Sequence, residues 1–352
     1  MKKNALTISR LAIIAALLAF MLPSIATAAP AQRGNMPSSV MMGAGQQGSS
    51  TYAIAVAISD VLQKNMGIPH SVSPAPGLSG VVELLRSKEV QLGIINTSHG
   101  RLAYSGAKGV ENLYKGYAAM GPVRSLRLLV AGDIMPLGIL ARGDIYTPKD
   151  LKGKKVYAID LGSEGTYASV LGILKAANLS AKDMTLLEYP DSSQGIKWVA
   201  GGKGDAVHTS ASGSKIKEFE MTVGKGNGRF VSVPITPEAM DIYQFYYPGV
   251  VPYTEEVGAP CLPKGTTMYA MVNALTTRDD VSENLAYTVT KTVTENTKTL
   301  AAVRKELAAW NVKSTVAYLP AVPFHSGAIK YFKEKGAWTA ALEKRQQELL
   351  KN

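Results

Sequence analysis

The sequence predicts an α/β protein with two lobes, in which each lobe is a mixed β-sheet flanked by helices. Three observations lead to this prediction. Short apolar segments typical of buried strands alternate with amphipathic segments typical of helices. Similar polar sequences open a helix in each half of the chain. The length of 352 residues is also sufficient for two domains of ordinary size.

Hydrophobic periodicity defines the individual elements. Ile54, Ile58 and Leu62 recur on one face of a helix predicted at residues 52–64. Continuous apolar runs are typical of strands that are buried on both faces. These runs predict strands at 39–42, 92–95, 126–131, 137–141, 155–159 and 267–272, and the periodic segments 164–177 and 283–297 predict further helices.

A weak internal repeat relates the two halves. Residues 48–53 read Gly-Ser-Ser-Thr-Tyr-Ala, and residues 162–168 read Gly-Ser-Glu-Gly-Thr-Tyr-Ala. Each is followed after a further helix and a short strand by a second polar loop, at 96–98 and 208–210. Unless these short matches are coincidental, all four loops lie at the carboxyl ends of strands, where open α/β sheets bind ligands.

The predicted lobes are built from discontinuous parts of the chain. Lobe I comprises residues 33–135 together with 240–352, and lobe II comprises residues 136–239. The expected crossings between them are 130–142 and 231–237, because each is an apolar segment that ends in turn residues.

The N-terminus has the pattern of a secretory signal peptide. Lys2, Lys3 and Arg10 precede an apolar run at 11–22, and small residues lead to an expected cleavage site at Ala28–Ala29. An uncleaved anchor is the alternative, but the run is shorter than the roughly 20 residues that a spanning helix needs. The sequence therefore predicts that residues 1–28 are removed and that the protein is periplasmic.

Charge and cysteine content narrow the possible functions. Cleavage of the 28 leader residues removes three basic residues and no acid, so the formal net charge falls from +11 to +8. A basic exported protein suits an anionic ligand or surface. Nucleic-acid binding is not predicted, because the basic residues are scattered and do not alternate with aromatic residues. Cys261 is the single cysteine, which excludes an internal disulfide.

A glycine-rich loop at 43–48 matches the pattern G-x-G-x-x-G between a strand and a helix. A dinucleotide site needs an acidic residue at the end of the next strand, and residues 70–75 contain none. Glycines let the backbone approach a ligand, and free N–H groups at a helix start attract an anion. The loop is thus predicted to hold an anion or polar ligand, with a structural turn or a nucleotide site as alternatives.

The segment 162–166 is the second such helix start. The hydroxyl groups of Ser163 and Thr166 suit a carboxylate or phosphate, although either could simply cap the helix. The tyrosine-rich segment 242–249 suits either the wall of a cleft or internal packing.

Catalysis finds little support in the sequence. His70, His99, His208 and His325 are not spaced as metal ligands, and neither a G-x-S-x-G elbow nor a Walker loop is present. The sequence therefore predicts no enzyme activity, no cofactor and no metal. An exported hydrolase or transferase remains the alternative from another functional class.

Several motifs occur together as they do in one known protein family. They are the glycine loop at 43–52, the segment 81–98, Pro148 to Val156, Gly162 to Thr166, Tyr247-Pro248-Gly249-Val250-Val251-Pro252, and His325-Ser326-Gly327-Ala328-Ile329. With these motifs the chain resembles the substrate-binding proteins of tripartite ATP-independent periplasmic (TRAP) transporters, in the branch called TAXI. The resemblance extends over nearly all of the mature chain.

This resemblance implies a type II-like periplasmic binding protein fold that closes on its ligand. It implies a small carboxylate as ligand, such as glutamate, a related amino acid or a dicarboxylate, and delivery to a TRAP permease that an ion gradient drives. A monomer is expected. Gln46-Gln47, Ser49-Ser50 and 96–99 depart from the usual residues of the family, so the substrate can differ. An ATP-driven (ABC) importer or a periplasmic sensor is the alternative partner system.

Combining these features, we expect the ligand carboxylate to lie between the start of the helix at 164 and the glycine loop of the other lobe. Contacts from both lobes exist only in the closed form, so the ligand favours closure. The predicted ligand-binding residues are Gln46, Gln47, Ser49, Ser50, Thr51, Tyr52, Asn96, Thr97, Ser98, Ser163, Glu164, Gly165, Thr166 and Ser210.

Overall fold

The structure is a computed structural model that describes residues 36–161, 163–211, 214–318 and 320–351. From Met36 onward these residues form one compact unit. The predicted signal peptide and Gly162 lie outside the described residues. Within the described part of the chain, no helix has the length and apolar character needed to cross a membrane.

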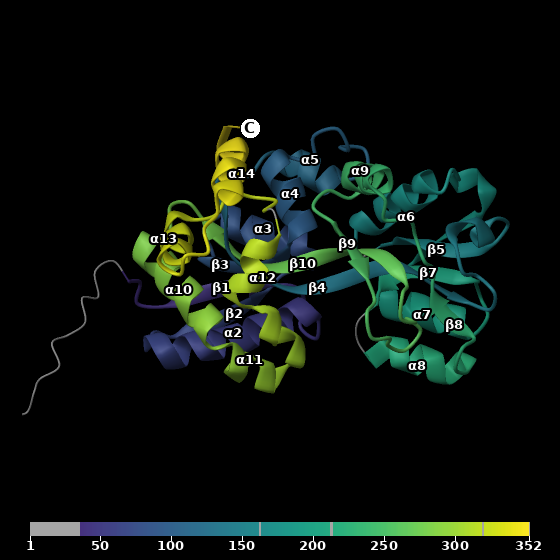
Figure 1. The fold of residues 1–352 in the computed structure, drawn as a ribbon, viewed down its shortest axis with the longest axis horizontal. Helices are drawn as coiled ribbons and strands as arrows, with labels where there is room; N and C mark the ends of the chain where they lie inside the picture. Colours follow the sequence, from purple (N-terminus) through teal and green to yellow (C-terminus); the bar gives the residue numbers. More distant parts are fainter. Residues whose placement is uncertain (1–35, 162, 212–213, 319, 352) are drawn as a thin grey trace, which may run out of the picture. The chain divides into compact units, whose positions relative to one another are not determined.

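One mixed sheet of ten strands forms the centre of this unit (Figure 1). Its main order is β2-β1-β3-β10-β4-β7-β5-β6, with β8 paired to β4 and β9 paired to β10. The strands are β1 (Val40–Ala44), β2 (His70–Pro74), β3 (Leu92–Asn96), β4 (Leu126–Arg142), β5 (Lys155–Asp160), β6 (Thr185–Tyr189), β7 (Ala206–Ser210), β8 (Gly228–Phe230), β9 (Val251–Thr254) and β10 (Thr267–Arg278). The predicted α/β class with a mixed sheet and flanking helices is confirmed.

Helices cover both faces of the sheet. Helix α4 contacts α3 and α5 on one face, and α2 contacts α10 and α11 on the other (Figure 1). Further along the sheet, α6 packs against α9 and α7 against α8. The helices are α2 (Ser50–Met66), α3 (Gly77–Arg86), α4 (Thr97–Ser105), α5 (Lys115–Met120), α6 (Gly165–Ala176), α7 (Ser192–Ala200), α8 (Ser214–Val223), α9 (Pro237–Tyr246), α10 (Glu283–Glu295), α11 (Thr297–Val303), α12 (Val312–Ala317), α13 (Ser326–Glu334) and α14 (Ala340–Lys351).

Two long strands, β4 and β10, make the sheet continuous. On one side of them lie β1, β2 and β3, which we call the first half-sheet, and on the other lie β5, β6 and β7, the second half-sheet. The sequence predicted a separate sheet in each lobe, with 126–131 and 137–141 as separate strands. Because both segments belong to the single strand β4, the two half-sheets are joined.

The sequence predicted an apolar strand for the second crossing, at 231–237. Residues 231–236 form no strand, and the N–H of Val233 donates to the carbonyl of Thr267, 2.9 Å away. The strand that accompanies β4 through the sheet is instead β10. Strand β9, which the sequence assigned to lobe I, pairs with the part of β10 that begins at Thr267. The lobe boundaries themselves stay a prediction.

The strand registers bring two carboxyl edges together. Strands β1, β2 and β3 are parallel and end at one edge of the first half-sheet, and β5, β6 and β7 are parallel and end at one edge of the second. Asn96, at the end of β3, pairs with Asn273, and Ser210, at the end of β7, pairs with Leu137. Since Val272 pairs with Ile134, the two edges face each other across the middle of β4 and β10.

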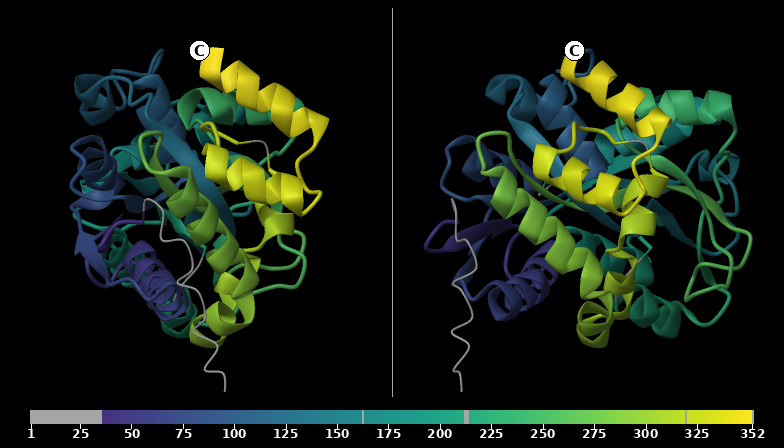
Figure 2. Two further views of the ribbon diagram at one scale, coloured as in Figure 1. Left: turned by 90° about the vertical axis from the view of Figure 1, so that its left-hand side faces the viewer. Right: turned by 60° about the vertical axis from the view of Figure 1, so that its left-hand side comes forward.

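The C-terminal helices complete the cover of the first half-sheet. Helix α13 makes its most extensive helix contact with α10, and the two lie side by side in the views of Figure 2. The side chain of Gln346, on α14, bonds both the N–H and the carbonyl of Phe324. These contacts hold α13 and α14 against the body of the protein.

Candidate ligand-binding site

A cavity of about 400 Å³ lies where the two carboxyl edges meet. We call it the edge cavity. The start of α3 lines it from the first half-sheet, and the start of α6 and the end of β7 line it from the second. Met135 and Met271, on β4 and β10, lie between these two groups. Residues from both half-sheets can therefore contact one small molecule at the same time.

The structure brings some of the predicted site residues to this cavity. Those that line it are Asn96, Ser163, Glu164, Thr166 and Ser210. Within the described residues, the other predicted ones lie outside its lining: Gln46, Gln47, Ser49, Ser50, Thr51, Tyr52, Thr97, Ser98 and Gly165. The segment 76–79 takes the place that we predicted for the glycine loop.

The side chains of the glycine-loop region have local structural roles. The hydroxyl of Ser49 accepts a hydrogen bond from the N–H of Tyr52, 3.2 Å away, and so caps α2. The hydroxyl of Ser50 accepts from Arg304 at 3.4 Å, and Gln46 and Gln47 are exposed. These contacts support a structural turn, which was one of the alternatives for the glycine loop at 43–48.

Two more of the predicted site residues, Thr97 and Ser98, form hydrogen bonds with segments that are distant in the sequence. The hydroxyl of Thr97 accepts from the N–H of Val272 at 3.2 Å. The hydroxyl of Ser98 donates to the carbonyl of Pro248. These bonds tie the start of α4 to β10 and to the loop after α9, so they position the site without lining it.

Two of the helices that begin at the edge cavity, α3 and α6, lack a side-chain N-cap, as do α5 and α11. Helices α2, α4, α7, α9, α10 and α13 each have an N-cap side chain that accepts a bond from a backbone N–H of the first turn. Helices α3 and α6 have no such bond. Both line the cavity, one from each half-sheet. Because the first N–H groups of a helix have no partner within the helix, these two starts offer donors to an anion.

The charged side chains that line the edge cavity, Asp160 and Glu164, are both acidic. The carboxylate of Asp160 accepts from the hydroxyl of Ser192 at 3.2 Å, and that of Glu164 accepts from the N–H of Gly116, on α5, at 2.9 Å. Within the described residues, the lining contains neither lysine nor arginine. The positive net charge that pointed to an anionic ligand is thus located elsewhere, and backbone N–H groups and hydroxyls are the donors present here.

Two histidines line this cavity, His208 buried and His99 partly buried. A ring nitrogen of His208 lies 2.6 Å from the hydroxyl of Ser169, and a ring nitrogen of His99 lies 2.5 Å from the hydroxyl of Tyr117. Burial lowers the pKa of both rings to about 4. Both are therefore neutral near pH 7 and offer the cavity hydrogen-bonding groups without charge.

This burial predicts a pH dependence of stability. Because the pKa of His208 is about 4 in the folded protein and ordinarily 6.5, the unfolded chain binds more protons between these values. The free energy of unfolding should then fall as the pH decreases from 6.5 to 4, by up to about 1.4 kcal/mol per pH unit for each such ring. In urea titrations at several pH values, His208→Gln should show a shallower fall than the wild-type protein. Equal slopes would contradict a neutral buried ring.

Sequence reasoning missed part of the cavity lining. The segment 76–79, Asp160 and Tyr117 were not proposed as ligand contacts. The sequence does mark 77–80 as a third glycine-bearing helix start with fewer polar groups. It also allows a ligand hydrogen bond for His99 and His208, although a structural role was the preferred interpretation of both histidines. The tyrosine-rich segment contributes Tyr247 to the wall, as one of its two interpretations proposed.

One protein-family model matches most of the chain. The model of the NMT1-like family matches residues 42–336. No curated protein matches the chain.

The chain is similar to several solved structures. They include the GluR0 ligand-binding core from Nostoc punctiforme in complex with glutamate (14% identity, 76% of this chain and 98% of that one, TM-score 0.45). Another is the periplasmic aliphatic sulphonate binding protein SsuA from Escherichia coli (17%, 90% and 86%, TM-score 0.48). A third is PhnD1 from Prochlorococcus marinus with methylphosphonate (10%, 86% and 100%, TM-score 0.48). At TM-scores below 0.5 such similarities are too remote to identify a ligand.

Proposed function

Because the chain belongs to the NMT1-like family, we propose that it is a periplasmic solute-binding protein that captures a small carboxylate and delivers it to a membrane transporter. An amino acid such as glutamate or a dicarboxylate fits the proposal. The function consists of binding and release and contains no catalytic step.

One observation carries this proposal. Helices α3 and α6, neither of which has an N-cap side chain bonded to its first turn, begin at the same cavity and on opposite sides of it. A carboxylate between them can accept hydrogen bonds from N–H groups of one helix and from the hydroxyl of Thr166 on the other. Each hydrogen bond to a charged group contributes about 1.5–3 kcal/mol, so about three or four of them suffice for micromolar affinity.

Closure of the protein on its ligand follows from the same arrangement. Glu164, beside α6, already bonds the N–H of Gly116 on α5, which packs with α4 over the first half-sheet. A ligand that contacts α3 and α6 at the same time adds hydrogen bonds that can form only when the protein is closed. The ligand therefore shifts the population toward the closed form.

For the transporter itself we propose a TRAP permease. The motifs Tyr247-Pro248-Gly249 and His325-Ser326-Gly327-Ala328-Ile329, on which the resemblance to the TAXI branch rests, lie within the family match. Reconstitution of the protein with its permease tests this: uptake should follow a sodium or proton gradient and continue without ATP. Uptake that requires ATP hydrolysis would assign the protein to an ABC importer instead.

Thr166 provides a direct test of ligand placement. Thr166→Val keeps the volume of the side chain and removes its hydroxyl, so the ligand should bind at least about tenfold more weakly. The ligand is first identified by a thermal-shift screen of amino acids, dicarboxylates and sulfonates, and its affinity is then measured by calorimetry. Thr222→Val, on the exposed surface of α8, is the matched control. Unchanged affinity in Thr166→Val would show that the ligand lies elsewhere.

A further inference from the structure

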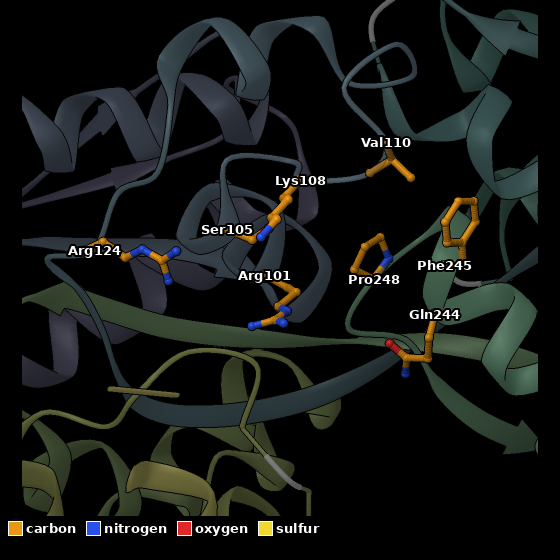
Figure 3. Close-up of a pocket in the computed structure, with 8 residues that line it drawn as sticks. All are labelled: Arg101, Ser105, Lys108, Val110, Arg124, Gln244, Phe245 and Pro248. Atoms are coloured by element: carbon orange, nitrogen blue, oxygen red, sulfur yellow. The ribbon is translucent and has the colours of Figure 1, made fainter. Parts of the chain in front are cut away.

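A second cavity, of about 390 Å³, has a different chemical character. We call it the Arg101 cavity. Arg101, Lys108 and Arg124 line one side of it, and Val110, Phe245 and Pro248 line the other (Figure 3). It shares no lining residue with the edge cavity. On α4, His99 contributes to the edge cavity, whereas Arg101 and Ser105, one helical turn apart, contribute to this one.

The positive charges of the Arg101 cavity are only partly compensated, because the carboxylate of Glu111 interacts with Lys108. Within the described residues, no ion pair involves Arg101, Lys108 or Arg124. The guanidinium of Arg124 lies over the ring of Tyr104, 4.8 Å from its centroid. Burial and the nearby charges of Arg345 and Arg124 lower the pKa of Arg101. Three cations thus line one hollow, and an anion there would relieve the repulsion between Arg101 and Arg124.

The opposite wall is mainly apolar, with Gln244 as its polar member. Phe245 is 56% exposed although it is a large hydrophobic residue, and Pro248 also lines this wall, whereas Val110 is buried. An inorganic anion would interact with the cationic wall only. A ligand that fills the whole space needs an apolar body attached to its anionic group.

We propose that the Arg101 cavity is a second binding site, for a small organic anion whose carboxylate or phosphate group contacts Arg101, Lys108 and Arg124 and whose aromatic or short alkyl body packs on Phe245. Guanidinium groups bind planar carboxylates and phosphates through paired hydrogen bonds, which gives the cationic wall its selectivity. The apolar wall distinguishes such a ligand from free phosphate.

Calorimetric titration with phenyl phosphate and with inorganic phosphate tests the proposal. Phenyl phosphate should bind saturably at one site and at least about tenfold more tightly than inorganic phosphate, a difference of about 1.4 kcal/mol. Arg101→Gln and Lys108→Gln should each weaken phenyl phosphate binding by about tenfold. Phe245→Ala should remove the preference for phenyl phosphate over inorganic phosphate. Lys108 and Phe245 are exposed, so their replacement leaves the fold intact.

Two controls separate this site from other effects. Lys298→Gln removes one positive charge from the exposed surface of α11, and it should not change the affinity. Thr166→Val should weaken the solute of the edge cavity and leave phenyl phosphate binding unchanged. The proposal is overturned if phenyl phosphate does not saturate, if Lys298→Gln weakens it as much as Lys108→Gln does, or if Thr166→Val alone abolishes it.

Discussion

Replacing Trp310 with alanine is expected to lower the free energy of unfolding by about 3–5 kcal/mol, the range for a fully buried large aromatic residue. Trp310 has no exposed surface. Its indole N–H donates to the carboxylate of Asp133 at 2.8 Å. The indole also packs directly on Gly132, where an added Cβ would lie 2.1 Å from the ring. Gly132 and Asp133 belong to β4, so the contact supports a strand that joins the two half-sheets.

Urea denaturation measures this loss, and Trp198→Ala is the matched control. Trp198 packs on Tyr157 with 5.3 Å between ring centroids and is only partly buried, so its removal should cost less. A double-mutant cycle makes the test specific. Gly132→Ala should destabilise the wild-type protein and have little effect when Trp310 is alanine, because the clash has then disappeared. If Gly132→Ala has the same cost in both proteins, the proposed contact is wrong.

Gly327→Ala is expected to destabilise the protein by about 3 kcal/mol, at the upper end of the range for overpacking. Gly327 lies in the first turn of α13, where this helix crosses α10. A Cβ here would lie 2.4 Å from the carbonyl oxygen of Glu283 and 2.6 Å from the nitrogen of Tyr287. Both are backbone atoms, so a side-chain rotation cannot relieve the clash and the two helices have to separate.

Thermal and urea unfolding of Gly327→Ala should be compared with Gly100→Ala. Gly100 also lies in a helix, but a Cβ there would meet only the side chains of Ile95 and Val322, at 3.5 and 3.6 Å. Alanine at this position should be neutral or stabilising by up to about 1 kcal/mol, because alanine favours the helix more than glycine does. Similar losses in the two variants would exclude the close helix crossing as the cause.

Local periodicity was sufficient to predict most elements of the fold. The helix predicted at 52–64 is α2 (Ser50–Met66), and the strand predicted at 155–159 is β5 (Lys155–Asp160). The apolar segments on both sides of Asp133 were correctly assigned to strands but not joined. A carboxylate in the middle of a sheet that is covered on both faces costs free energy unless it has hydrogen-bond partners. Asp133 obtains them from Trp310 and Asn273, which are distant in the sequence.

The candidate site was only partly predictable, and the two glycine-bearing helix starts illustrate why. Both the segment 162–166 and the loop at 43–48 have residues that suit an anion, but only the first lies at the edge cavity. Helix α2, which follows the glycine loop, packs with α10 and α11 on the face of the sheet opposite α3 and α4. The apolar stripe of a helix requires burial against a sheet and does not specify which face covers it.

The amino-acid order alone thus decides the α/β class, most elements and the local chemistry of each helix start, because these depend on neighbours within a few residues. Three-dimensional packing decides which of those helix starts share a cavity, and it places Asp160, Tyr117 and the segment 76–79 beside Thr166. The registers of β4 and β10 bring the two carboxyl edges together. Such pairings join residues that are between 65 and 185 positions apart in the sequence, and no local pattern encodes them.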